Sequence, residues 1–339
     1  MKKMTAIFLV SAISLASCAL ALSGCADGGE KFTLSEEGGK HYIVSYSALS
    51  SPFGEYEIPA YYGEGENYAP VTEIADEGFA STRFSKIKVP ATVTKIGTAA
   101  FSFCYSLETV EFADGIALEK FSRGMFGESD NLQEIKIPDS VKTIEARAFS
   151  GCTSLSSVEM NSVESIGMRA FAECTALESV KFPSSLTAIG EAAFYGAGLK
   201  SIEIPDSVAD TVTVDADGNE ITARGLGYGA FIGCTSLESV RIGSGVSVIP
   251  SGAFGYCISL KEIYIPLSVK EIEGSYYENG TFRYGHAFYS DKALTDVYYE
   301  GTKEQWQFIK IETDVRTEGG TQLDNKALIN ALKHYNNEM

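Results

Sequence analysis

PDSVKTIEARAFSGCTSLSSVEMN, residues 138–161, is one copy of a unit that recurs along most of the 339-residue chain. The most regular member of the unit is a phenylalanine, which is Phe149 in this copy. It returns at intervals of 22, 23 or 25 residues in six of eight gaps, and the gaps of 37 and 34 residues hold the same unit with an insertion. The repeat phenylalanines are Phe79, Phe101, Phe126, Phe149, Phe171, Phe194, Phe231, Phe254 and Phe288. A period in the low twenties is typical of a solenoid built from stacked coils.

Other residues keep fixed distances from the repeat phenylalanine. An aliphatic residue lies five positions before it, often a cysteine three after, a leucine six after, and apolar residues nine and eleven after. The last positions alternate between apolar and polar residues, which predicts a half-buried strand, and a proline commonly ends that strand. The AxxAFxxC part has the spacing of a single helical turn. Because so short a coil cannot bury its own apolar face, the repeat phenylalanines and leucines are expected to form one core shared by neighbouring coils.

The consensus IPDSVxxIxxxAFxxCxSLxxVxIP resembles the BspA-like leucine-rich repeat of bacterial surface proteins over residues 70–306. Residues 297–306, VYYEGTKEQW, also resemble the closing segment of such arrays. The resemblance implies a right-handed leucine-rich solenoid with a parallel β-sheet and short helical or 3-10 turns, in about nine coils of roughly 23 residues. It also implies an exported or surface-anchored protein, and some members of that family bind host proteins.

Residues 1–24 have the layout of an export signal, with two lysines followed by an apolar run too short for a firm membrane span. The run ends in LSGC, which resembles the bacterial lipobox, where the cysteine becomes the diacylated first residue. Cys25 is the preferred site, because the chain becomes polar directly after it, whereas Cys18 in LASC is followed by more apolar residues. We therefore expect an exported protein, anchored through lipid on Cys25 to a bacterial membrane or cell surface.

The chain is acidic, with a formal net charge of −18 at pH 7. Loss of residues 1–24 removes two lysines and no acid, so the mature charge becomes −20. Nucleic acid is excluded as a partner, because its phosphates require a basic footprint. The same charge would not draw the body of the protein onto anionic lipid. A soluble extracytoplasmic monomer is expected, with an unknown extracellular protein or glycan as its partner.

The seven cysteines do not predict disulfides. Two of them belong to the export segment, and the other five all lie three residues after a repeat phenylalanine, a place called here the plus-three position. These five are Cys104, Cys152, Cys174, Cys234 and Cys257. Other coils have Ser129, Ala197 or Asp291 there, and a position that accepts Cys, Ser or Ala favours a small buried side chain. No CxxC cluster is present, so neither a metal site nor a cofactor is predicted.

One residue of each predicted strand should point away from the core, because strand side chains alternate. Down the array this residue is Lys88, Glu111, Lys136, Glu159, Lys181, Glu203, Arg241, Tyr264 and Tyr298. Neighbouring strands lie about 4.8 Å apart, so the alternating charges should form a ladder of cross-strand ion pairs. A charged binding strip is the other interpretation, but alternation cancels the field that would attract a charged ligand, which favours the structural ladder.

The two tyrosines that end the ladder are candidate ligand-binding residues, together with three tyrosines of an insertion at residues 273–287. The candidates are Tyr264, Tyr276, Tyr277, Tyr284 and Tyr298. Insertions in repeat proteins often carry binding, and tyrosine is enriched at protein contacts, so these side chains are expected to form an aromatic patch. The alternative, which we favour, is that the insertion packs against the last coils as a lid. An Asn-Gly pair predicts a hairpin tip at residues 279–280.

The chain divides into an export signal (1–24), an N-terminal linker and β cap (25–69), the array (70–306) and a C-terminal cap (307–339). Within the array, insertions lie near residues 208–229 and 273–287, and the first reads as a β-hairpin. Alternating runs at 41–46 and 56–58 predict strands over the first coil. Apolar residues at helical spacing in 321–336 predict a helix that shields the last coil, with Trp306 packed there.

Catalysis is not expected. The three histidines lie in separate segments, and no HExxH, GxSxG or phosphate-loop motif is present. Two functions remain. The first is a surface-displayed binding or adhesion module for a protein or glycan, which should show a contiguous exposed aromatic patch. The second is a structural or accessory envelope lipoprotein, whose surface should be charged and polar all round.

Overall fold

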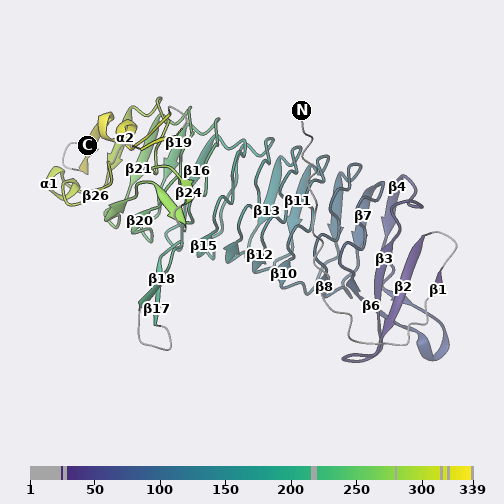
Figure 1. Cartoon of the computed structure of the whole chain (residues 1–339). Helices are drawn as coiled ribbons and strands as arrows, with labels where there is room; N and C mark the ends of the chain where they lie inside the picture. Colours follow the sequence, from purple (N-terminus) through teal and green to yellow (C-terminus); the bar gives the residue numbers. More distant parts are fainter. Residues whose placement is uncertain are drawn as a thin grey trace, which may run out of the picture.

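The computed structural model describes residues 24–25, 29–214, 220–278, 281–313, 316–318 and 321–336. The strands stand side by side in one elongated array, with the N-terminal strands at one end and the C-terminal strands at the other (Figure 1). The predicted export segment lies outside the described residues apart from Gly24, which with Cys25 forms β1 (Gly24–Cys25). The two predicted hairpin tips, at 215–219 and 279–280, also lie outside the described residues.

The longer strands form two parallel sheets on one side of the array. The first has the order β13-β11-β9-β7-β4 and the second the order β16-β19-β21-β25-β29. Their bounds are β4 (Gly54–Glu57), β7 (Phe84–Val89), β9 (Thr109–Phe112), β11 (Glu134–Ile137), β13 (Ser157–Met160), β16 (Ser201–Glu203), β19 (Ser239–Arg241), β21 (Glu262–Ile265), β25 (Asp296–Tyr299) and β29 (Leu332–Tyr335). Every pairing within these sheets joins one coil to the next, as the repeat predicts.

A second row of short parallel strands contains the apolar residue that lies five positions before the repeat phenylalanine in seven of the nine coils, and two further strands extend the row; this residue is Phe121 in one coil and isoleucine in the other six. Its members are β6 (Ala69–Ile74), β8 (Lys95–Ile96), β10 (Lys120–Phe121), β12 (Thr143–Ile144), β14 (Ser165–Ile166), β15 (Ala188–Ile189), β20 (Val248–Ile249), β22 (Glu271–Ile272) and β26 (Lys310–Ile311). The apolar residue that ends each of these strands is buried, except Ile311, which is partly buried. Ion pairs link exposed residues of these coils, such as Lys120 Nζ with Glu145 Oε1 at 2.6 Å.

The AFxxC part folds as tight turns and not as a helical turn. In one coil Arg147 and Gly151 both have positive φ, 59° and 78°, which interrupts helical backbone. The turns instead hydrogen-bond from coil to coil, because the Phe149 N–H donates to the Ala170 carbonyl at 2.8 Å and the Phe171 N–H to the Ala193 carbonyl at 2.8 Å. The predicted helical turn is therefore wrong in detail, although the turns do stack.

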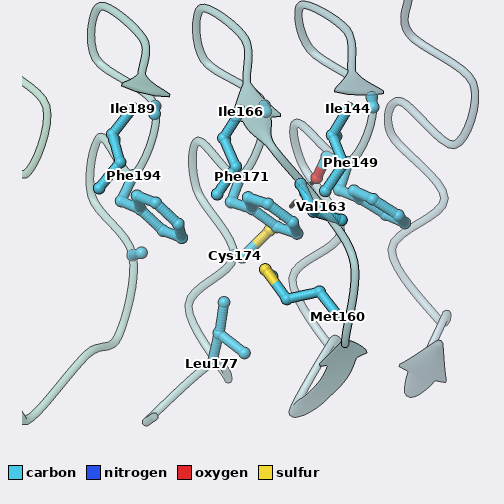
Figure 2. Packing of buried hydrophobic residues seen from close by; sticks show 14 of the residues in the cluster. Ile144, Phe149, Met160, Val163, Ile166, Phe171, Cys174, Leu177, Ile189 and Phe194 are labelled. Carbon is cyan, nitrogen blue, oxygen red and sulfur yellow. Dashed lines mark hydrogen bonds between the residues drawn. The ribbon is translucent and has the colours of Figure 1, made fainter. Parts of the chain in front are cut away.

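The repeat phenylalanines form a continuous column through the core. All nine are fully buried, and successive ring centroids in the central coils lie 5.0–5.4 Å apart with nearly parallel planes. Figure 2 shows Phe149, Phe171 and Phe194 in this column with Ile144, Ile166 and Ile189 beside them. The prediction that these residues make a core shared between coils is confirmed. Aromatic pairs contribute about 0.5–1.5 kcal/mol beyond the area that they bury.

The plus-three position holds a hydrogen-bond donor that joins one coil to the coil before it. The Cys152 thiol donates to the Phe126 carbonyl at 3.1 Å, and the Cys174 thiol to the Phe149 carbonyl at 3.2 Å. Ser129 does the same with the Phe101 carbonyl at 2.7 Å. All five repeat cysteines are buried free thiols. The position therefore requires a small side chain, as predicted, and in these coils that side chain also satisfies a buried carbonyl.

At the N-terminal end, strands extend both sides of the array. β2 (Glu30–Ser35) pairs antiparallel with β3 (His41–Tyr46), and β3 pairs parallel with β6. β5 (Tyr61–Tyr62) adds an antiparallel edge next to a 3-10 turn, η1 (Gly65–Asn67). Strands were predicted at 41–46 and 56–58, and the structure has β3 and β4 in these places. β4 pairs with β7 in the same direction as the strands that follow it.

The C-terminal cap differs from the predicted helix. It contains α1 (Lys303–Trp306), β27 (Arg316–Glu318), β28 (Thr321–Leu323) and α2 (Lys326–Asn330), followed by β29. β29 pairs parallel with β25, so the ladder continues past residue 306 and satisfies backbone groups that an open sheet edge would expose. Asn325 closes the turn side, because its Oδ1 accepts the Phe288 N–H at 3.1 Å. Trp306 packs edge-on against Tyr299, with centroids 5.3 Å apart.

Both insertions are antiparallel hairpins. The first consists of β17 (Thr211–Val214) and β18 (Glu220–Ala223), as its alternating sequence predicts, and it projects from the array (Figure 1). The second consists of β23 (Tyr276–Glu278) and β24 (Thr281–Tyr284). The second hairpin lies against the turns of the last coils, where it positions three of the candidate tyrosines.

Asp291 leads to a prediction about pH. It occupies the plus-three position of the last repeat and is fully buried, and burial raises the pKa of its carboxyl well above the usual value. The titratable groups beside it, Cys257 and Tyr289, are neutral because burial raises their pKa values as well. The folded protein therefore keeps a proton on Asp291 that the unfolded chain releases above about pH 4.

Stability should therefore fall as pH rises from about 4 toward the folded-state pKa of Asp291, by up to about 1.4 kcal/mol per pH unit. Asp291→Cys restores the residue most common at this position and should remove that dependence. The measurement is denaturant unfolding of both proteins between pH 4 and 8, in which the variant gains on the wild type as pH rises. Two curves that stay parallel across this range would show that Asp291 does not carry the buried proton.

Candidate binding surfaces

The exposed face of the sheets carries the predicted row of outward-pointing residues, except Lys181, which lies in a segment without a strand between β13 and β16. Backbone pairing aligns Lys88 with Glu111, Lys136 with Glu159, Glu203 with Arg241, and Tyr264 with both Arg241 and Tyr298. The row is also longer than predicted, by one residue at each end. Glu57 pairs with Lys88 at the N-terminal end, and His334 pairs with Tyr298 at the C-terminal end.

The predicted ladder of ion pairs is only partly formed. Within the row, Lys88 Nζ lies 3.9 Å from Glu57 Oε2, and Arg241 Nε lies 3.7 Å from Glu203 Oε1. Glu111 instead binds Lys86, two residues before Lys88 on β7, at 2.6 Å. Exposed pairs of this kind gain little free energy, because fixing two long side chains costs rotamer entropy. The alternating charges therefore keep this face electrically balanced more than they hold the coils together.

At the C-terminal end of the row three rings form an aromatic column, defined as Tyr264, Tyr298 and His334. The Tyr264 and Tyr298 centroids lie 4.5 Å apart at 9°, and Tyr298 and His334 also lie 4.5 Å apart, at 14°. The Arg241 guanidinium lies 5.8 Å from the Tyr264 centroid and continues the stack on its other side. Because these neighbours cover the ring faces, the column presents ring edges and hydroxyl groups to solvent.

The electrostatics of the aromatic column favour hydrogen bonding. Desolvation raises the pKa of the Tyr298 phenol, and the nearby carboxylates of Asp296 and Glu262 add to that shift, so the hydroxyl stays protonated. A hydrogen bond with His334 lowers the pKa of Asp296, and the Asp296 Oδ1–His334 Nε2 distance is 2.8 Å. Tyrosine donors and a charged carboxylate acceptor thus lie side by side on this surface.

Hollows follow the carboxyl ends of the strands beside the aromatic column. One, of about 230 Å³, is lined by Tyr264, Tyr298 and Arg241 together with Pro266 and Glu300. Another, of about 570 Å³, shares Arg241, Pro266 and Glu300 with the first and extends back to β16 and the coil before it. The two hollows therefore adjoin as one groove at the C-terminal end, and Tyr264 and Tyr298 of the aromatic column line its smaller part.

The tyrosines of the second insertion take part in a different structure, the hairpin cluster, defined as Tyr228, Tyr276 and Tyr284. Tyr228 stacks on Tyr276 at 4.3 Å and lies 6.3 Å from Tyr284. Tyr284 is 9% exposed, and its hydroxyl donates to Glu191 Oε1 at 2.8 Å. An added Cβ on Gly229 would lie only 2.5 Å from the Tyr284 ring, so glycine is required for this close approach.

The structure divides the five candidate tyrosines between two faces and does not bring them into one patch. Tyr264 and Tyr298 lie on the sheet face, whereas Tyr276 and Tyr284 pack on the turns, as expected for a lid. Tyr277 is 43% exposed at the margin of the hairpin. Sequence reasoning missed Tyr228, which precedes the seventh repeat phenylalanine, and it missed His334, although alternation in LKHY is a strand signal.

A membrane-spanning helix and a metal site are both absent from the described ranges. No helix in them is long and apolar enough to cross a membrane. In the same part of the chain, no group of histidine, cysteine, aspartate and glutamate side chains is arranged to hold a metal ion.

Comparison with known proteins agrees with the repeat. Residues 72–163, 157–213 and 220–299 match the model of the BspA type leucine rich repeat region, in six copies. A leucine rich cell surface protein from Faecalibacterium prausnitzii A2-165 is 24% identical, with 88% of this chain and 100% of that chain covered at a TM-score of 0.49. A leucine-rich repeat protein from Bacteroides ovatus ATCC 8483 is 18% identical, with 90% and 98% covered at a TM-score of 0.48. No curated protein matches the chain.

The packing of Tyr284 predicts a structural effect of mutation. Tyr284→Ala should lower the free energy of unfolding by about 3–5 kcal/mol, as truncation of a buried aromatic ring does. Tyr284→Phe, which loses only the bond to Glu191, should cost about 1 kcal/mol. The control is Tyr105→Ala, because Tyr105 is 57% exposed and its loss should stay within about 0.5 kcal/mol. If denaturant unfolding shows Tyr284→Ala to be as mild as this control, the hairpin is not held down by its tyrosines.

Proposed function

The chain belongs to the BspA-type leucine-rich repeat family, and on that premise we propose that it is a binding or adhesion module displayed at the bacterial cell surface. Its ligand is a protein or a glycan, and its anchor is lipid on Cys25. The array holds the binding surface away from the anchor, because β1 and the aromatic column belong to opposite ends of the stack (Figure 1).

One observation carries the proposal, namely the change in the exposed row from alternating charge to stacked aromatic rings beside a groove. A purely structural ladder has no need of that change, because charged pairs would serve equally at every coil. Arg241, Tyr264 and Tyr298 also line the hollow at this end. Tyrosine and arginine side chains are enriched at the energetic centres of protein interfaces, which supports a binding role for this end of the array.

The geometry also supports a class of contact. The faces of the Tyr264 and Tyr298 rings are covered by each other, by Arg241 and by His334. A ligand therefore cannot stack flat on Tyr298, as a sugar does on an open aromatic platform. It meets hydroxyl donors, the Asp296 carboxylate and the backbone-lined groove instead, so hydrogen bonds to a polar ligand supply the specificity.

The second candidate function, an envelope scaffold without an external ligand, has its own support. Ion pairs join lysines and glutamates of neighbouring coils on the remaining surface, for example Lys200 with Glu178 and Lys261 with Glu238, each at 2.7 Å. Such pairing suits a spacer, because paired charges attract a charged partner less than unpaired charges would. The hypothesis of an envelope scaffold does not explain the aromatic column, and we therefore prefer the binding module.

The test is a pull-down and glycan-array screen with residues 26–339 and two matched variants. Tyr264→Ser/Tyr298→Ser removes both tyrosine rings of the aromatic column and leaves His334. Lys136→Ser/Glu159→Ser changes the same row in the charged part of the array and controls for altered surface. The expected result is binding by the wild type and the control variant, with at least about tenfold weaker binding by the tyrosine variant.

Other outcomes separate the alternatives. Equal binding by all three proteins keeps a binding function and shows that the aromatic column is not its site. In that case Tyr277→Ser tests the exposed margin of the hairpin. Absence of binding by every protein, while circular dichroism shows them folded, favours the envelope scaffold.

A further inference from the structure

The loop between β3 and β4 lies at the N-terminal end of the array (Figure 1). It carries two large apolar side chains that are exposed. Leu49 is 96% exposed and Phe53 is 73% exposed. Residues of this size that stand so far into solvent on an ordered loop lose the free energy that burial would provide, about 1.5–3 kcal/mol for each side chain. No role in the core or in the aromatic column accounts for them.

The loop is held in place by hydrogen bonds. The buried Ser51 hydroxyl donates to the Ala48 carbonyl at 3.0 Å and accepts the Arg83 N–H at 3.0 Å. Arg83 Nε also donates to the Ser51 carbonyl at 2.9 Å, and the guanidinium lies 5.0 Å from the Phe53 ring centroid. The two apolar side chains are therefore presented on a fixed turn beside a cation.

The apolar surface continues onto the following coils. The Ser81 N–H donates to the Ser102 carbonyl at 2.8 Å, which places the turn of the Phe79 coil beside the turn of the Phe101 coil. There Phe103 is 46% exposed and Tyr105 57% exposed, with their rings 6.4 Å apart. Leu49, Phe53, Phe103 and Tyr105 are called here the N-terminal apolar patch.

The patch lies next to the predicted lipid anchor. The Ser47 N–H donates to the Gly29 carbonyl at 2.9 Å, and Gly29 is four residues from Cys25, a distance that extended chain spans in at most about 14 Å. The backbone pairing agrees, because Cys25 is aligned with Lys31 and Lys31 with Ser45, so Cys25 lies about two strand spacings, roughly 10 Å, from Ser45, which is two residues before the start of the loop.

We propose that Leu49 and Phe53 insert into the surface of the bilayer that holds the acyl chains of Cys25. The occupant of the N-terminal apolar patch is thus a lipid surface, with Arg83 placed to pair with lipid phosphate while its neighbour Phe53 enters the acyl boundary. The first coils rest on the membrane, and the array carries the aromatic column away from it. This inference rests on the proposed anchoring at Cys25.

The experiment uses the full chain, produced in a bacterium that processes lipoproteins and reconstituted in zwitterionic vesicles with brominated acyl chains. Trp306 is the single tryptophan and lies at the far end of the array, so the wild type reports on the distal coils. Leu49→Trp in a Trp306→Phe background reports on the loop. Thr175→Trp in the same background is the matched control, because Thr175 is an exposed turn residue in the middle of the array.

The expected result is strong quenching and a blue shift of emission for tryptophan at position 49, with neither change at positions 175 and 306. Adding Phe53→Ser to the Leu49→Trp protein should reduce the quenching at least twofold. Mass spectrometry of the N-terminal peptide reads the anchor separately. An acylated Cys25 with unquenched tryptophan at position 49 overturns the membrane contact and leaves the anchor intact, and an unacylated Cys25 overturns both.

A second copy of the chain is the competing occupant. Emission from position 49 that is blue-shifted but insensitive to bromine, together with a dimer in light scattering of the detergent-solubilised protein, would show that the patch is covered by another copy and would contradict the membrane contact. The double variant Leu49→Ser/Phe53→Ser tests whether these two side chains contribute to folding. Because both are exposed, it should leave the free energy of unfolding within about 0.5 kcal/mol of the wild type.

Discussion

The structure depends on one constraint, which is that no coil can bury its own apolar side chains or hydrogen-bond all of its own backbone groups. The ring of each repeat phenylalanine needs the ring of the next coil against its face, and successive rings in the central coils lie 5.0–5.4 Å apart. The backbone has the same need, because the Phe149 carbonyl is reached by the Cys174 thiol of the following coil. Stability in such a stack is approximately a sum of coil terms and interface terms. The ends are therefore special, and Asn325 closes the last turn by accepting the N–H that another coil would otherwise have bound.

Much of this architecture follows from spacing alone. A fixed interval identifies the phenylalanines, the plus-three residues and the outward row, because each must recur at the same place in every coil. The C-terminal cap was predicted less well, since apolar residues such as Leu328 and Ala331 fit helical spacing although the chain forms a short helix and then the strand β29. The division of the tyrosines also escaped prediction. The docking of Tyr284 depends on space left by Gly229 and Gly252 in other coils, and no local pattern encodes that space.

The balance of charge explains where function can lie in a molecule of this kind. Along the middle of the array, alternating lysine and glutamate cancel the field of the sheet face, so a ligand gains little there. Apart from the two insertions, the features that the repeat does not explain lie at the two ends. At one end, Leu49 and Phe53 lie next to the predicted anchor, and at the other the aromatic column borders a groove. The repeat in between sets the distance and orientation of these two surfaces, which is the contribution that a rigid stack of coils makes to a binding module.

Removal of one coil is the most direct test of whether each coil is completed by its neighbours. Deletion of residues 150–171 joins Phe149 to Ala172 and removes one full period of 22 residues, so the phenylalanine column and the sheet close again in register. We expect a folded protein with a cooperative unfolding transition. Its long dimension in solution scattering should be shorter by about one strand spacing, roughly 5 Å. Deletion of residues 150–160 removes only half a coil and should disrupt folding at that point. An unfolded protein after the full-period deletion, or equal tolerance of both deletions, would contradict the claim that each coil is built from its neighbours.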